Sequence, residues 1–260
     1  MVNYAFNFAD LEYFLLIFVR ITCFIYIAPF LSMTNTPNRV KIGLGLFLTY
    51  LIDQSLPHEE IAYATLLEFT IMVMKEAVTG FIIGFGANLC TTIVSFAGHI
   101  ADMETGLSMA TIFDPTTNQQ TSISGVYYQY VVMLLLLVSG LHQYIVSALV
   151  ETFEIIPING AVFHIDSLLD TMVNFLSSYI IIGFRIALPV FAVILIVNAV
   201  LGVLAKVSPQ MNMFAVGIQI KLLVGLSVLF LTTGMMPSAA NFIFEQMKIM
   251  MVSFVEGMRP

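Results

Sequence analysis

The stretch TMVNFLSSYIIIGFRIALPVFAVILIVNAVLGVLA, residues 171–205, contains a single charged side chain, Arg185. Residues 115–150 contain none, and Lys221 is the only charged residue in 207–244. One helical crossing of a bilayer core needs about 20 apolar residues, so each run is long enough to span a membrane. Strands of a membrane barrel would show a ten-residue alternation instead. The sequence therefore predicts an all-α integral membrane protein.

The composition supports this class and excludes several others. Hydrophobic residues make up 59% of the chain and charged residues only 10%, against about 25% charged residues in a typical soluble domain. A net charge of −7 without a basic patch argues against a nucleic-acid partner. Cys23 and Cys90 lie in apolar runs and are interpreted as packed thiols. No zinc, phosphate-binding or nucleophile motif is present, so we expect no enzymatic activity, no metal and no cofactor.

Turn residues divide the chain into about six apolar segments. The second segment is short for a span, while the third and fifth are long enough to be tilted, kinked or broken. We expect several bent or broken helices. The segments are roughly 11–33, 42–56, 66–98, 126–150, 171–204 and 210–243.

The positive-inside rule places most of the connecting loops, but it fails at one of them. Arg39 and Lys41 indicate a cytoplasmic first loop, and Lys206 indicates a cytoplasmic fifth loop. The third loop should then also be cytoplasmic, yet residues 99–125 contain three acidic residues and no basic one. Its central part, MATIFDPTTNQQTSISG (109–125), is neutral and polar apart from Asp114. An ordinary cytoplasmic tether does not explain this composition.

Isolated charges in or beside the apolar runs form a second set of candidate residues. Such charges are costly in hydrocarbon unless they are paired or face water. We predict interhelical ion pairs that fix the assembly geometry, and a polar lumen or proton path is the alternative. The residues are Arg20, Glu68, Lys75, Glu76, Asp102, Glu104, Arg185 and Lys221.

Glycine spacing predicts close helix packing at two places. Gly80 and Gly84 form a GxxxG motif, in which two small residues let another backbone approach. Gly98 and Gly106 flank Asp102 at intervals of four residues, which would put all three on one helix face.

The C-terminal segment has the pattern of an amphipathic helix. Glu245, Lys248, Glu256 and Arg259 fall on one side, and methionine and phenylalanine side chains take most of the rest. Its apolar face either lies on a membrane or a partner, or packs against the chain itself.

Three long stretches together resemble one protein family. They are APFLSMTNTPNRVKIGLGL (28–46), AGHIADMETGLSMATIFDP (97–115) and NAVLGVLAKVSPQMNMFAVGIQIKLLVG (198–225). In this order and spacing they resemble the FliR family, whose relatives in type III secretion are called SpaR, YscT or HrcT. The resemblance covers nearly the whole chain, and the second and third stretches are long, non-periodic motifs.

The resemblance implies an assembly in the bacterial cytoplasmic (inner) membrane, within the flagellar basal body. Proteins of this family join several copies of FliP and FliQ in a helical stack around a pore, the flagellar export gate. FlhB is expected at the cytoplasmic base, and unfolded flagellar proteins are the cargo. Residues 1–165 would resemble FliP, and residues 166–260 a long FliQ-like hairpin with the amphipathic C-terminal helix.

The resemblance also assigns a role to the neutral loop, as the plug that closes the pore. Phe113 would be an apolar contact in the constriction, and Asp114 and Pro115 would set a turn. The neutral polar residues would give a wettable surface that holds neither charge sign. The plug comprises Met109, Ala110, Thr111, Ile112, Phe113, Asp114, Pro115, Thr116, Thr117, Asn118, Gln119, Gln120, Thr121 and Ser122.

Three other interpretations stay open at this level. The chain could serve a virulence secretion system, as homologous subunits do. It could be a proton-coupled transporter of small solutes that uses Asp102, Glu104 and His142, although no inverted repeat is visible. It could also be a structural membrane scaffold with an inert loop.

Overall fold

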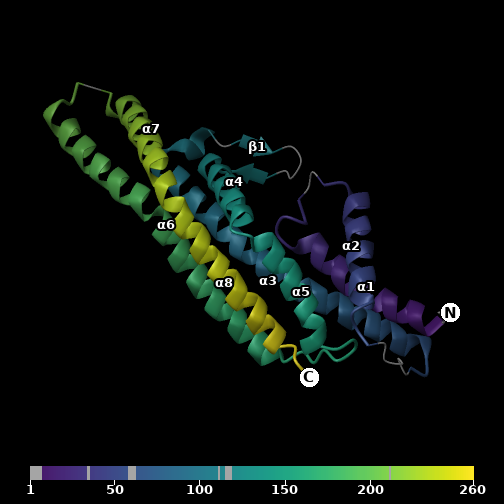
Figure 1. Ribbon diagram of the computed structural model, residues 1–260. Coiled ribbons are helices and arrows are strands. Elements are labelled where there is room, and N and C mark those ends of the chain that lie inside the picture. The colour runs from purple at the N-terminus through teal and green to yellow at the C-terminus, as the bar shows by residue number, and fades with distance from the viewer. Residues whose placement is uncertain (1–7, 34–35, 58–62, 111, 115–118, 211) are drawn as a thin grey trace. The chain divides into compact units, whose positions relative to one another are not determined.

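The computed structural model spans residues 1–260 and describes all of them except 1–7, 34–35, 58–62, 111, 115–118 and 211. The described residues form eight α-helices, two short 3-10 helices and one two-stranded antiparallel sheet (Figure 1). The predicted all-α membrane class is confirmed, and the small hairpin is the only β-structure in the described part.

The helices follow one another along the whole chain and are joined by short connections. The α-helices are α1 (Phe8–Ile27), α2 (Asn38–Asp53), α3 (Leu66–Thr105), α4 (Ile123–Val138), α5 (Leu141–Ile155), α6 (Ile165–Val207), α7 (Met213–Thr232) and α8 (Met236–Glu256). The remaining elements are η1 (Leu107–Ala110), β1 (Ile112–Asp114), β2 (Gln119–Thr121) and η2 (Thr233–Met235).

Three helical runs among the described residues are long and apolar enough to cross a membrane: α3, α6 and residues 215–256. The pair α4 and α5 is a fourth candidate, bent by 68° at its break. Helices α1 and α2 are not among these candidates: α1 carries Asp10, Glu12 and Arg20, and α2 has only 16 residues. An apolar segment in this chain is therefore not always a plain span.

The break between α4 and α5 falls in the fourth apolar segment, and not in the third or fifth, which are the long ones. Helices α3 and α6 continue without interruption over 40 and 43 residues, and Pro189 lies inside α6. The fourth segment is the one that breaks, at Ser139 and Gly140. Gly140 has φ +80°, a left-handed conformation that glycine adopts without a steric penalty.

The chain divides into two compact units, each built from separate parts of the sequence. The first unit comprises 1–89, 140–173 and 246–260, and the second comprises 90–139 and 174–245. This division follows contacts within the chain. The expected division at residue 165 rests on resemblance to separate subunits, and it stays a prediction.

Each unit has its own apolar core. In the first unit, Leu16, Ile17, Ile21 and Phe24 of α1 are fully buried together with Ile83 of α3. The second unit buries Ile93 and Val94 of α3, Tyr128 of α4, and Val190 and Ile194 of α6.

The apolar face of α8 is covered by the chain itself. Met247, Met250 and Phe254 are buried in the first unit. A Cβ added to Gly86 would lie 2.5 Å from Cδ2 of Phe254, so this ring uses the space that a glycine leaves on α3. Of the two alternatives for the C-terminal helix, the structure supports the packing face.

Candidate functional site in the loop between α3 and α4

The loop begins where α3 is stopped by a glycine. Gly106 follows the last helical residue, Thr105, and has φ +83°. A left-handed residue just after a helix is a common terminator, and glycine suits it best. A Cβ at Gly106 would meet nothing within 4 Å. Gly106 therefore serves to end α3 at Thr105, and its packing against another helix stays a prediction.

The backbone of the loop leaves η1 and folds into the small hairpin. Strand β1 pairs with β2 in the register Ile112 with Thr121, Phe113 with Gln120, and Asp114 with Gln119. Met109, in η1, is exposed over 74% of its surface.

Much of the predicted plug lies beyond what the structure describes. Thr111 and 115–118, hence Pro115, Thr116, Thr117 and Asn118, lie outside the described residues. For Ala110 and the six strand residues, Phe113 and Asp114 among them, only the backbone is described. The roles expected for these side chains stay predictions.

The loop returns into α4 through two caps. Ser122 is the N-cap residue, and its Oγ accepts a hydrogen bond from the amide of Gly125 at 2.8 Å. The amide of Ser124 donates to the carboxylate of Asp102, 3.2 Å from Oδ1 and 3.3 Å from Oδ2. Asp102 belongs to α3 and is only 1% exposed. Its negative charge also suits the positive end of the α4 dipole.

A glycine contact brings α3 and α4 together beside these caps. A Cβ on Gly98 would lie 2.2 Å from Cα of Gly125, so the two backbones touch at that level. Gly98 and Asp102 lie one turn apart on α3, and both meet the first turn of α4. The end of the loop is therefore held at a fixed position on α3.

Helix α7 packs beside the start of the loop. A Cβ on Gly225 would lie 2.4 Å from Cγ2 of the buried Thr105. The hydroxyl of Tyr127 lies 2.8 Å from Oγ1 of Thr233. A cavity of about 330 Å³ lies here, lined by Leu107, Ile123, Ser124, Tyr127, Leu226, Leu229 and Phe230. Ser124 is 2% exposed and its Oγ has no hydrogen-bond partner among the described residues.

The sequence pattern pointed to the loop but missed its return anchor. Ser124 and Gly125 were not among the predicted residues, although the Gly98–Gly125 contact and the Asp102–Ser124 bond hold the loop. The available signal was Ser122, since serine directly before an apolar helix is a preferred N-cap residue. The partner of Asp102 could not be read because it lies 22 residues further along the chain.

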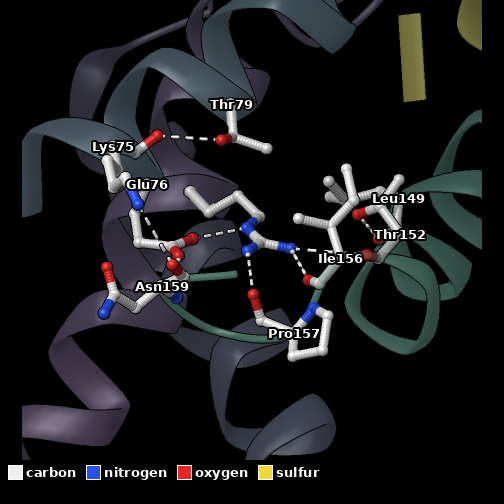
Figure 2. A network of polar contacts seen from close by, with 9 residues as sticks. Lys75, Glu76, Thr79, Leu149, Thr152, Ile156, Pro157 and Asn159 are labelled. Atoms are coloured by element: carbon white, nitrogen blue, oxygen red, sulfur yellow. Dashed lines mark hydrogen bonds and ion pairs between the residues drawn. The ribbon is translucent and has the colours of Figure 1, made fainter. Parts of the chain in front are cut away.

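In the first unit, Arg20 of α1 and Glu76 of α3 form a buried ion pair, both 0% exposed, with Nε 2.5 Å from Oε2 (Figure 2). The guanidinium also donates to the carbonyl of Ile156 at 2.9 Å. It lies 4.3 Å from the ring centre of Phe153. These contacts offset the hydration that the buried guanidinium has lost.

The same network fixes the connection between α5 and α6. The backbone amide of Asn159 donates to Oε1 of Glu76 at 2.8 Å, and Lys75 Nζ donates to the carbonyl of Asn159 at 3.3 Å (Figure 2). Asn159 has φ +63°, which asparagine tolerates better than most residues. Residues 156–159 are thus tied to α1 and α3 through their backbone.

The GxxxG motif of α3 lies against α1 at this network. A Cβ on Gly80 would lie 2.1 Å from the carbonyl oxygen of Arg20, and one on Gly84 would lie 3.0 Å from that of Phe24. Only glycine allows the two backbones to come this close.

The other predicted charges have different surroundings. Glu68 is exposed and accepts a hydrogen bond from the amide of Ala64 at 2.7 Å. Arg185 is exposed, and Glu104 and Lys221 are half-buried. None of these three makes a hydrogen bond or ion pair with another residue that the structure describes, so their pairing stays a prediction. The described residues contain no group of three His, Cys, Asp or Glu side chains that could hold a metal ion.

Comparison with known proteins now decides the family. Residues 11–247 match the family described as bacterial export proteins, family 1. The chain belongs to this family.

Similar proteins give the family its usual name, FliR. The chain is 30% identical to the flagellar biosynthetic protein FliR of Escherichia coli K12 over 224 residues, 86% of this chain and 84% of that protein. The FliR proteins of Pectobacterium carotovorum (30% over 231 residues, 88% and 87%) and Bacillus subtilis (28% over 221 residues, 83% and 84%) are also similar. The predicted FliR family is confirmed, and it is a family of export components rather than enzymes.

Proposed function

We propose that this chain is a subunit of the flagellar protein export gate in the bacterial cytoplasmic membrane. With FliP and FliQ it would build the protein-conducting pore, and residues 109–122 would form a plug in that pore. FlhB would contact its cytoplasmic base, and unfolded flagellar proteins would be the cargo. Family membership supports the export role, and the relatives' names support the flagellar system.

The observation that carries the plug role is the fixed position of a neutral loop. Gly98 and Asp102 of α3 hold the start of α4, and Gly106 ends α3 on the other side. A loop held at both ends can occupy one place in a pore without being tethered by charge. The segment 115–122 has no ionisable side chain, so it offers nothing for a passing chain of either charge sign to bind strongly.

The surface of the chain supports an assembly with other membrane proteins. Large apolar side chains are exposed along α6 and α7, such as Ile181, Leu188 and Phe230. Lipid would cover apolar side chains as well as a protein partner would. Arg185 and Lys221, however, have no ion-pair partner among the described residues, and a polar partner or water would reduce the cost of such charges.

Replacing the middle of the loop tests the plug directly. In the assembled gate, we expect deletion of Thr111–Gln120 to raise the leak of small ions strongly while FliP and FliQ still co-purify with the chain. A matched variant replaces these ten residues with a Gly/Ser linker of equal length. If a neutral chain of this length is enough to close the pore, the linker variant does not leak, and if Phe113 seals the pore, it leaks as the deletion does.

The outcomes separate the plug from the other functions. An unchanged leak in the deletion variant, with an intact complex, would sink the plug role. Failure of the wild-type chain to co-purify with FliP and FliQ would sink the gate assignment. Uptake of small solutes by the purified chain alone would favour the transporter, but no contact favours it here, since the Asp102 carboxylate caps α4.

A further inference from the structure

Arg185 is a cation on the long, apolar helix α6, and it has no ion-pair partner among the residues that the structure describes. It is the only charged residue in 171–205 and lies near the middle of α6. Its side chain is exposed, and it makes no hydrogen bond or ion pair with any residue that the structure describes. An exposed guanidinium among apolar side chains is costly in a membrane unless a carboxylate or water meets it.

The helix surface beside Arg185 has the spacing that a second helix requires. Ile181, Phe184, Leu188, Phe191 and Leu195 are all exposed and are separated by three, four, three and four residues. This is the 3-4 spacing of the contact seam between two packed helices. We call these five residues the α6 seam. Arg185 takes the position directly flanking the seam, where charged residues pair between helices.

A cavity lies on the other side of Arg185. It measures about 250 Å³ and is lined by Arg185, Pro189, Met235, Met236 and Phe242 with five further residues, mainly apolar. Pro189 has no amide hydrogen, so the carbonyl of Arg185 lacks its usual helical donor. Arg185 therefore borders open space beside the seam that can receive a side chain.

We propose that the α6 seam docks a membrane helix of another export-gate subunit, which carries an Asp or Glu that pairs with Arg185. This inference rests on the proposed function, since it needs an assembled gate. Lipid tails could cover the seam, but they offer no charge for Arg185. A carboxylate matches the guanidinium in charge and can accept two hydrogen bonds from it. The occupying helix presents apolar residues at 3-4 spacing, with the carboxylate flanking them.

The first experiment identifies the occupant in the assembled gate. A photo-crosslinking amino acid is placed at Leu188, in the seam, or at Val200, an exposed residue on another side of the same helix. The cross-linked peptides are then sequenced by mass spectrometry. We expect Leu188 to cross-link to one helix of another gate subunit, with an Asp or Glu within about one turn of the cross-link. A cross-link only to lipid, or to a helix without an acidic residue, overturns the proposal.

The second experiment tests the ion pair by charge. Arg185→Glu places two negative charges together, and we expect at least about a tenfold loss of the cross-linked partner from the purified gate. Arg185→Lys keeps the charge and should retain most of the partner. Lys206→Glu makes the same charge change near the end of α6, away from the seam, and should have no effect. Exchange of the partner's acidic residue for Arg should restore assembly with Arg185→Glu.

Loss of the ion pair can be distinguished from misfolding of the chain and from failure of the gate assignment. Arg185 makes no hydrogen bond or ion pair with a residue that the structure describes, so the Arg185→Glu chain alone should keep wild-type helicity and abundance. If the wild-type chain assembles but Arg185→Glu assembles equally well, the proposal is wrong and the gate assignment stands. Rapid reaction of an Arg185→Cys gate with a charged, water-soluble thiol reagent would place residue 185 in a water-filled lumen and also overturn it.

Discussion

At the scale of single residues, the Arg20–Glu76 ion pair is completely buried, and both side chains also hold backbone groups. Arg20 and Glu76 share one hydrogen-bonded contact, and their other hydrogen bonds go to backbone groups of Thr152, Ile156, Pro157 and Asn159. The sequence predicted that such charges pair, but it could not give the partner, because these two residues lie 56 positions apart. Only the packing of α1 on α3 brings them together.

Removing one partner of the Arg20–Glu76 pair should lower the free energy of unfolding far more than replacing both partners with apolar residues. We expect Arg20→Met or Glu76→Met alone to lower the free energy of unfolding by about 3–5 kcal/mol, because each leaves a buried charge without a partner. The double variant should lose clearly less free energy of unfolding than the two single variants lose together. Denaturant unfolding of the purified chain in detergent measures all three variants. Additive losses would show that the two charges do not stabilise each other.

At the scale of the elements, Asp102 ties the start of α4 to α3. Asp102→Ala removes the acceptor of the Ser124 amide, and losing a cap costs about 1 kcal/mol, or roughly fivefold in local opening. We expect faster hydrogen exchange at Ser124 and Gly125 in this variant. Asp102→Asn retains an acceptor oxygen and serves as the control. Exchange in the alanine variant as slow as in the wild-type chain would show that the carboxylate does not hold α4.

The contact between α3 and α1 depends on the absence of a side chain at Gly80. In Gly80→Ala, the new Cβ would lie 2.1 Å from the carbonyl oxygen of Arg20, so the helices must separate. We expect a large loss of unfolding free energy, at least about 2 kcal/mol, as is typical of overpacked cores. Thermal unfolding in detergent measures it.

Gly43 provides the matched control for that substitution. It lies in α2, and a Cβ there meets nothing within 4 Å. Gly43→Ala should therefore leave stability unchanged or raise it by up to about 1 kcal/mol, through better helix propensity. Equal behaviour of the two variants would contradict the close approach at Gly80.

The sequence predicted which elements exist better than where they end. Turn residues marked most of the connections, since Pro, Gly and Asn do not continue a helix well. The break at Gly140 was missed because no charged residue interrupts the run from α4 into α5. The four-residue repeat of Gly98, Asp102 and Gly106 predicted that all three share one helix face. Helix α3 ends at Thr105, however, so Gly106 lies just beyond it.

At the scale of the whole molecule, the apolar surface is divided between the chain's own cores and a remainder that stays exposed. Met247, Met250 and Met251 of α8 are buried in the first unit, whereas α6 exposes its seam. A periodicity argument alone treats both faces alike, because it reports which residues share a face and not what covers that face. The difference separates internal packing from the surface that we propose other subunits occupy.

The sequence by itself determined the membrane class, the helical fold, the family and the unusual neutrality of the loop. These properties follow from composition, local periodicity and extended motifs, which are all readable along the chain. Tertiary structure alone decided the partners of Arg20 and Asp102, and the glycines at which helices touch. Such contacts join residues far apart in sequence, and they depend on how helix faces meet in space, which no local pattern specifies.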